Sequence, residues 1–138
     1  MDKVLITGGT GFVGYWMAKT APRNLHVYPL GHNDYKMENW HDTKWDYIVH
    51  LAPVSPYLVV SQAAKDLARL LYCSSGIVYH SENDIEYRRQ KINGEIYCQD
   101  SGVDVVIARL FTFYGARLDE HKAITQFERA AKENEPLQ

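Results

Sequence analysis

The sequence predicts an α/β protein with a doubly wound, mostly parallel sheet. Short apolar runs alternate with stretches of helical periodicity along its 138 residues, and strands separated by helices pair in parallel with right-handed crossovers. The apolar runs are nearly continuous, as in strands that are covered on both faces. A glycine-rich turn separates the first run from the first helical stretch.

Five β-rich apolar runs predict the strands of this sheet. They are Lys3–Thr7, Leu25–Leu30, Asp46–Leu51, Leu70–Cys73 and Val103–Leu110. Pro29 predicts that the second strand is an edge strand or carries a bulge near its end, because proline cannot donate to a central ladder. The polar and aromatic stretch from Gly31 to Lys44 is assigned to no element.

Four stretches have helical periodicity. They are Phe12–Thr20, Tyr57–Leu67, Glu86–Gln99 and Ala123–Lys132. Ser55 is expected to cap the second helix. In the third helix the spacing predicts that Ile92, Ile96 and Tyr97 face inward. Gly94 weakens that helix by about 1 kcal/mol relative to alanine, so we expect it to serve close packing.

The composition excludes several classes of protein. With 46% hydrophobic and 23% charged residues the chain is globular, and its net charge of −2 gives no basic surface for nucleic acid or an anionic membrane. No apolar run approaches the ~18–20 residues of a membrane span, and no signal peptide is recognisable. Two separated cysteines and six scattered histidines predict neither a disulfide framework nor a metal site. We expect a cytoplasmic protein with one domain over residues 1–138.

The turn after the first strand carries the sharpest local signal. The segment TGGTGFVG places glycines at Gly8, Gly11 and Gly14. The first glycine allows a tight turn, the second lets a diphosphate approach the backbone, and the third lets the helix pack close to the sheet. The helix N-terminus then offers N–H groups and the positive end of its dipole to phosphates. The pattern predicts a Rossmann-type dinucleotide site. It is not a P-loop, since no GK[ST] follows.

The choice between NAD and NADP stays open. Dinucleotide folds often place an acidic residue ~20 positions after the glycines, where it binds the ribose hydroxyl. Asp34 is the nearest acid but lies beyond the expected strand end, and Gly31 or His32 occupies the expected position. Neither Arg23 nor Lys36 is clearly placed for a 2′-phosphate.

Five segments, in order, resemble the extended short-chain dehydrogenase/reductase superfamily, in particular its NAD-dependent epimerase/dehydratase branch. They are TGGTGFVG at 7–14, WDYIVHLAP at 45–53, LYCSSGIVYH at 71–80, YRRQK at 87–91 and VVIARLFTFYGAR at 105–117. The third segment delivers the family's catalytic Ser or Thr four residues before the tyrosine of VYG. That tyrosine is Tyr79 here, so the match is Ser75. The fourth segment matches YxxxK with Tyr87 and Lys91.

The resemblance implies catalysis by Ser75, Tyr87 and Lys91 on a nucleotide-sugar substrate, as in an NAD(P)-dependent epimerase or dehydratase. Tyr87 and Lys91 lie four apart on a predicted helix and so share one face. A neighbouring ammonium lowers the pKa of a phenol, which lets the phenol act as a base. The resemblance implies cofactor contacts by Gly8, Gly11, Phe12, Val13, Gly14, Leu51, Ala52, Tyr87 and Lys91.

The sequence also departs from the family pattern. The stretches 31–46 and 53–70 are short, His80 replaces the usual glycine, and Leu110 stands in place of proline. The chain stops about where the family's C-terminal substrate-binding portion begins, so we expect that portion to be absent. Two further functions therefore stay open. One is a non-catalytic NAD(P)-binding module or truncated fragment, and the other is a small carbonyl reductase of the same superfamily.

Three residues also have purely structural interpretations. Asp46 is expected to be only a strand-start residue, and Arg109 either pairs structurally or meets the substrate. Ser75 is alternatively a turn cap. The resemblance also implies a homodimer, built by the helix that carries YxxxK and the helix before the serine strand.

Overall fold

A computed structural model of the chain describes residues 1–31, 39–80, 85–115 and 122–136. The predicted α/β class is confirmed, and all pairings in the sheet are parallel. The strand order is β2-β1-β3-β4-β5. The strands are β1 (Asp2–Thr7), β2 (Leu25–Leu30), β3 (Tyr47–His50), β4 (Arg69–Ser75) and β5 (Val105–Leu110).

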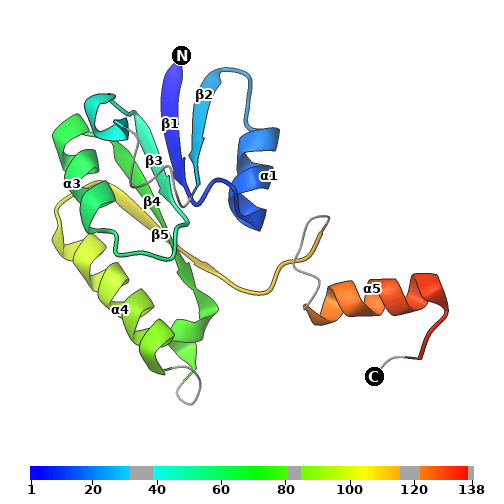
Figure 1. Ribbon diagram of the computed structural model, residues 1–138. Helices are drawn as coiled ribbons and strands as arrows, with labels where there is room; N and C mark the ends of the chain where they lie inside the picture. The colour runs from blue at the N-terminus through cyan, green and yellow to red at the C-terminus, as the bar shows by residue number, and fades with distance from the viewer. Residues whose placement is uncertain (32–38, 81–84, 116–121, 137–138) are drawn as a thin grey trace.

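Helices lie on both faces of this sheet, as Figure 1 shows. The helices are α1 (Phe12–Thr20), α3 (Tyr57–Asp66), α4 (Ile85–Asp100) and α5 (Ala123–Glu133), with short 3-10 turns η1 (Trp40–Asp42) and η2 (Gly76–Tyr79). One face of the sheet is covered by α1, and the other by α3 and α4. The helix α5 stands apart from the sheet. Among the described residues no helix has the length and apolar character that crossing a membrane requires.

The larger core lies under α3 and α4. Leu5, Ile48 and Leu70 are fully buried at its centre, one from each of three central strands. The indole of Trp45 packs among them and donates from Nε1 to the Trp40 carbonyl over 2.9 Å. Alternate residues of the same strands point to the opposite face, as the two-residue period of a strand requires.

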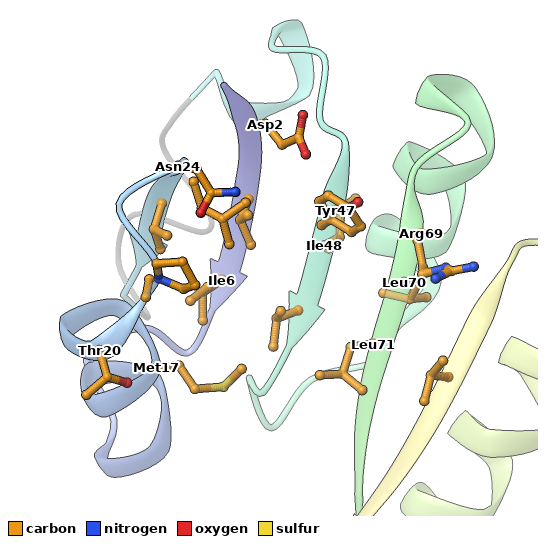
Figure 2. Close-up of a pocket in the computed structure, with 17 residues that line it drawn as sticks. Asp2, Ile6, Met17, Thr20, Asn24, Tyr47, Ile48, Arg69, Leu70 and Leu71 are labelled. Atoms are coloured by element: carbon orange, nitrogen blue, oxygen red, sulfur yellow. The ribbon is translucent and has the colours of Figure 1, made fainter.

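The opposite face is only partly covered. α1 packs on β1 and β2, and beside it a cavity of about 670 Å³ opens over the rest of the sheet, as Figure 2 shows. Ile6 and Leu71 line the floor of this cavity, and Val106 is 52% exposed. The expectation that helices cover every strand on both faces is therefore wrong for β5, none of whose residues is buried.

The expected inward face of the third helix was also wrong. In α4 Ile96 is 50% exposed and Tyr97 37% exposed, and Ile92 is only partly buried. Gly94 and Glu95 are buried instead. The reason is that the helix is turned so that its glycine meets an aromatic ring of β4 and its carboxylate meets an arginine of β5.

Smaller differences concern the ends of elements. Pro56, and not Ser55, is the residue before the first turn of α3; the Ser55 hydroxyl accepts only a long bond from the Tyr57 N–H, 3.4 Å. The placement of Pro29 in an edge strand is confirmed, since within the described ranges β2 pairs with β1 alone.

Candidate functional site

The chain order creates a cleft at the carboxyl ends of the strands. From β1 the chain passes through α1 to β2 on one side, and β3 then lies on the other side of β1. Ligands of open α/β sheets bind at such a switch point. A cavity of about 310 Å³ lies here, and its wall combines the glycine turn, the end of β4, α4 and the segment after β5. It is lined by Gly8, Gly11, Phe12, Val13, Gly14, Leu51, Cys73, Ser74, Ser75, Tyr87, Lys91, Leu110, Phe111 and Phe113.

The glycine turn is shaped by backbone contacts that exclude side chains. Gly8 has a φ of +75°, and a β-carbon there would lie 2.9 Å from the Ala52 nitrogen. A β-carbon on Gly14 would lie 2.4 Å from the Gly8 carbonyl oxygen. Ala52 is thus held against the turn, although it does not line the cavity. The structure requires glycine at both positions to bring strand, helix and loop this close.

The first turn of α1 faces this cavity with Phe12 and Val13. Its N-cap is Gly11, no side chain caps it, and its first turn holds no acidic residue. The first N–H groups of a helix have no partner within the helix, and they lie at the positive end of the dipole. The residues of this turn therefore fit the diphosphate of a dinucleotide.

Lys91 lines the cavity and is held by the backbone of β4. Its Nζ donates to the Cys73 carbonyl over 3.0 Å. The same atom lies 5.8 Å from the ring centre of Tyr87, one helical turn away on α4, and 5.5 Å from the ring centre of Tyr72. Burial lowers the pKa of Lys91 from its ordinary value. The expected pair therefore shares one face of α4 and one cavity.

Ser75 ends β4 and begins η2. Its Oγ accepts a hydrogen bond from the Ile77 N–H, 3.2 Å away, so it caps this turn as one interpretation predicted. It also lines the cavity with Tyr87 and Lys91. A hydroxyl that accepts from a backbone N–H still has its own proton to donate. Capping and a role in the cavity are therefore compatible.

His50 ties the glycine turn to the loop after β3. The buried ring lies with Nδ1 2.7 Å from the Thr7 hydroxyl and Nε2 3.1 Å from the Val54 carbonyl. Burial lowers the pKa of His50 to about 4, so the imidazole is neutral near pH 7. The carbonyl can only accept, so Nε2 carries the proton and Nδ1 accepts from Thr7. The sequence offered no signal for this bridge.

Arg109 and Asp46 have structural partners. The Arg109 guanidinium donates to both oxygens of Glu95, over 2.9 and 2.7 Å, and also bonds the Tyr79 hydroxyl. The Asp46 carboxylate accepts from the Lys3 N–H, 2.8 Å away. For Arg109 the pairing interpretation is supported, and Asp46 is a strand-start residue as expected.

Aromatic side chains close one side of the cavity. The rings of Phe12 and Phe113 stack with centres 5.7 Å apart, which joins the start of α1 to the segment after β5. That segment was matched to the family only by resemblance, and Phe111 and Phe113 were not among the predicted site residues. Phe111 and Phe113 are apolar and follow the carboxyl end of a strand. This position could have predicted that they line the cavity.

Several expectations fall outside the described residues. Asp34, His32 and Lys36, which were considered for the choice between NAD and NADP, are among them. Within the described ranges no three His, Cys, Asp or Glu side chains gather in a way that could hold a metal ion.

No family model matches the sequence. No curated protein matches it either. Solved structures do resemble it. The capsular polysaccharide assembling protein CapF from Staphylococcus aureus superposes with a TM-score of 0.76 at 25% identity, over 99% of this chain and 42% of CapF. The dTDP-glucose 4,6-dehydratase from Bacillus anthracis, solved in complex with NAD, gives 0.75 at 16% identity, over 99% and 63%.

The reductase domain of the aureusimine biosynthetic cluster gives a TM-score of 0.59 at 16% identity, over 96% of this chain and 55% of that domain. In each case the chain spans less than two thirds of the protein that it resembles. These likenesses establish the fold: the chain has the Rossmann-like α/β architecture found in CapF, in this NAD-bound dehydratase and in this reductase domain.

Proposed function

We propose that this chain is an NAD(P)-binding enzyme domain of the NAD-dependent epimerase/dehydratase type, acting on a nucleotide sugar with Ser75, Tyr87 and Lys91 as its catalytic residues. The observation that carries the proposal is the single cavity shared by these side chains and the glycine turn. Its support from known proteins is the fold shared with CapF and with the NAD-bound dehydratase.

The dinucleotide, when bound, supplies a hydride acceptor and donor. Gly8, Gly11 and Gly14 with the first turn of α1 would hold its diphosphate, and Lys91 would reach its ribose. Tyr87 takes the proton from a substrate hydroxyl as the carbon beneath it is oxidised. The ammonium of Lys91 favours the phenolate that this step needs.

Ser75 orients the same substrate oxygen by donating its free proton to it. This use of the hydroxyl leaves its bond to the Ile77 N–H in place. The arrangement holds the reacting oxygen between two side chains from different elements, Ser75 at the end of β4 and Tyr87 on α4. Such positioning lowers the barrier because little orientational freedom remains to be lost.

The experiment that tests this assignment compares two tyrosines of one helix. Tyr87→Phe should abolish turnover of NAD(P)-dependent reactions with a panel of UDP- and dTDP-hexoses, while calorimetry shows nearly unchanged dinucleotide binding. Tyr97→Phe is the matched control, since Tyr97 is similarly exposed on α4, 37% against 39%. Retained turnover in Tyr87→Phe would falsify the assigned base. Dinucleotide binding without any turnover in the native chain would favour a non-catalytic module.

A second candidate is a reductase of uncharged carbonyl compounds. Of the described residues that line the cavity, Lys91 alone is cationic, and Phe111 and Phe113 add apolar rings to its wall. A sugar nucleotide carries a second diphosphate that needs cations or helix ends of its own, whereas an aryl or alkyl ketone does not. Oxidation of NADPH or NADH by simple ketones, with no response to sugar nucleotides, would select this candidate.

A further inference from the structure

Four side chains form a continuous row, called here the ring ladder. They are those of His50, Tyr72, Lys91 and Tyr87. The rings of His50 and Tyr72 stack with centres 5.9 Å apart and planes 18° apart. The Lys91 Nζ lies 5.5 Å from the Tyr72 ring centre and 5.8 Å from that of Tyr87. Three elements contribute, β3, β4 and α4, so the row joins the sheet to the helix that carries YxxxK.

Tyr72 occupies its place in the ring ladder because α4 makes room for it. The side chain is 2% exposed, and its ring lies under the helix at Gly94. A β-carbon on Gly94 would lie 2.1 Å from the Tyr72 hydroxyl oxygen. The glycine therefore lets an aromatic face come close to Lys91, one turn earlier on the same helix.

A cation over an aromatic face is attracted by the negative potential of the ring, and the attraction is larger where water is excluded. Among the described residues, the Lys91 Nζ has one hydrogen-bond acceptor, the Cys73 carbonyl. An ammonium group has three protons to donate, and burial acts against its charged form. Among the described residues, no carboxylate lies within salt-bridge distance of the Lys91 ammonium. The Tyr72 ring supplies the attraction that a carboxylate would otherwise provide.

We propose that Tyr72 is a positioning residue, whose ring face holds the Lys91 ammonium charged and aimed toward Tyr87. The role belongs to the ring and not to the hydroxyl. The inference rests on the proposed function only for the catalytic use of the Lys91 charge, since the contact between Tyr72 and Lys91 exists without substrate.

The other titratable groups near the ring ladder each keep one charge state near pH 7. On α4, Glu95 has its pKa lowered chiefly by the bond from Arg109, and burial raises the pKa of Cys98 to about 11. On β4, burial raises the pKa of Cys73 to about 11, and burial likewise raises the pKa of Tyr72. On β3, His50 is neutral near pH 7. A change in the charge of the ring ladder near pH 7 therefore does not come from these neighbours.

Three replacements of Tyr72 distinguish the effects on Lys91 of its ring face, its hydroxyl and its shape. Tyr72→Phe removes only the hydroxyl. Pentafluorophenylalanine at position 72 keeps the shape of the ring but removes the negative potential of its face. Tyr72→Leu removes the ring and keeps an apolar side chain, so that burial of Lys91 is retained.

The readout is the proton affinity of Lys91 in the native chain, from the pH midpoint of its acetylation by acetic anhydride, followed by mass spectrometry. The fluorinated ring and Tyr72→Leu should lower this affinity about fivefold, the size of an ordinary cation–π contact. Tyr72→Phe should leave it within about twofold. Lys19, which lies 4.9 Å from the Trp16 ring centre, is an internal reference in the same spectra.

An unchanged midpoint with the fluorinated ring would overturn the proposal, as would an equal fall with Tyr72→Phe. Since labelling needs no substrate, it decides the role of Tyr72 even if no turnover is found. If turnover is found, the fluorinated ring should also move the acid limb of the kcat profile to higher pH, because a less strongly held ammonium favours the Tyr87 phenolate less. A purely structural role would lower kcat without moving that limb.

Discussion

Arg109 of β5 and Glu95 of α4 are joined by two parallel hydrogen bonds, of 2.9 and 2.7 Å. The Glu95 side chain is 7% exposed and that of Arg109 37% exposed. This pair fastens the helix of YxxxK to the edge strand of the sheet. Bidentate pairs of this kind fix geometry as well as adding attraction.

Arg109→Met should lower the free energy of unfolding, because it leaves the buried Glu95 carboxylate without its partner. The loss should be smaller than the cost of breaking a fully buried pair, because solvent reaches the arginine. Glu95→Gln combined with Arg109→Met should recover part of the loss, since no buried charge is then left unpaired. Urea unfolding at pH 7 measures both. The idea fails if the double variant is less stable than Arg109→Met alone.

Gly14→Ala and Gly11→Ala should differ in what they damage. A β-carbon on Gly14 meets the Gly8 carbonyl oxygen at 2.4 Å, whereas one on Gly11 meets it at 3.3 Å. Gly14→Ala should therefore cost about 2 kcal/mol or more of stability. Gly11→Ala should leave stability nearly unchanged and weaken NAD(P) binding about tenfold or more, because it stands where the diphosphate approaches. Calorimetry beside thermal unfolding separates the two effects, and equal loss of stability in both variants would contradict this account.

Protonation of His50 should destabilise the fold in mild acid. Its pKa is about 4 in the folded protein, mainly through burial, against an ordinary value of 6.5. The unfolded chain therefore binds the proton more readily, and stability is complete above pH 6.5 and falls as the pH approaches 4. The loss from this group is about 3 kcal/mol. Urea midpoints from pH 7 to 4 measure it. His50→Gln should flatten that part of the curve, and an unaltered slope in the variant would assign the loss to other groups.

Leu67→Gly should stabilise the protein. Leu67 ends α3 in the left-handed region, with a φ of 58°, and is 92% exposed. Glycine takes this conformation without the clash of a β-carbon, so the gain should be about 0.5–1 kcal/mol after its greater freedom in the unfolded chain is counted. Leu58→Gly, at an exposed position inside the same helix, should instead cost about 1 kcal/mol. Melting temperatures of the two variants should move in opposite directions.

The arrangement of elements was predictable because β-rich apolar runs alternate with helical stretches along the chain. Carboxyl ends of parallel strands meet at one edge of a sheet, so the glycine turn at Gly8 and the end of β4 at Ser75 had to come near each other. The inward face of α4 was not predictable from apolar periodicity. Gly94 and Glu95 fill that face, and their fit depends on partners from distant strands, Tyr72 and Arg109, which local pattern does not reveal.

The same limit applies to the finer parts of the site. The phenol of Tyr72 reads in the sequence as one more core side chain of a strand, and His50 as one more residue at a strand end. Their roles arise from contacts with Lys91 and Thr7, residues far away in the chain. The partly uncovered sheet was missed for a similar reason, since an apolar strand predicts that it is buried but does not say what covers it.

The open hollow beside α1 has a practical consequence for anyone who follows the folding of this protein. Fluorescent dyes that report exposed apolar surface can bind in this cavity of about 670 Å³ in the native protein. A bright signal at the start of a thermal melt is therefore no sign of unfolding. Intrinsic emission is the cleaner reporter, because two indoles, those of Trp40 and Trp45, lie sealed beneath the opposite layer of helices.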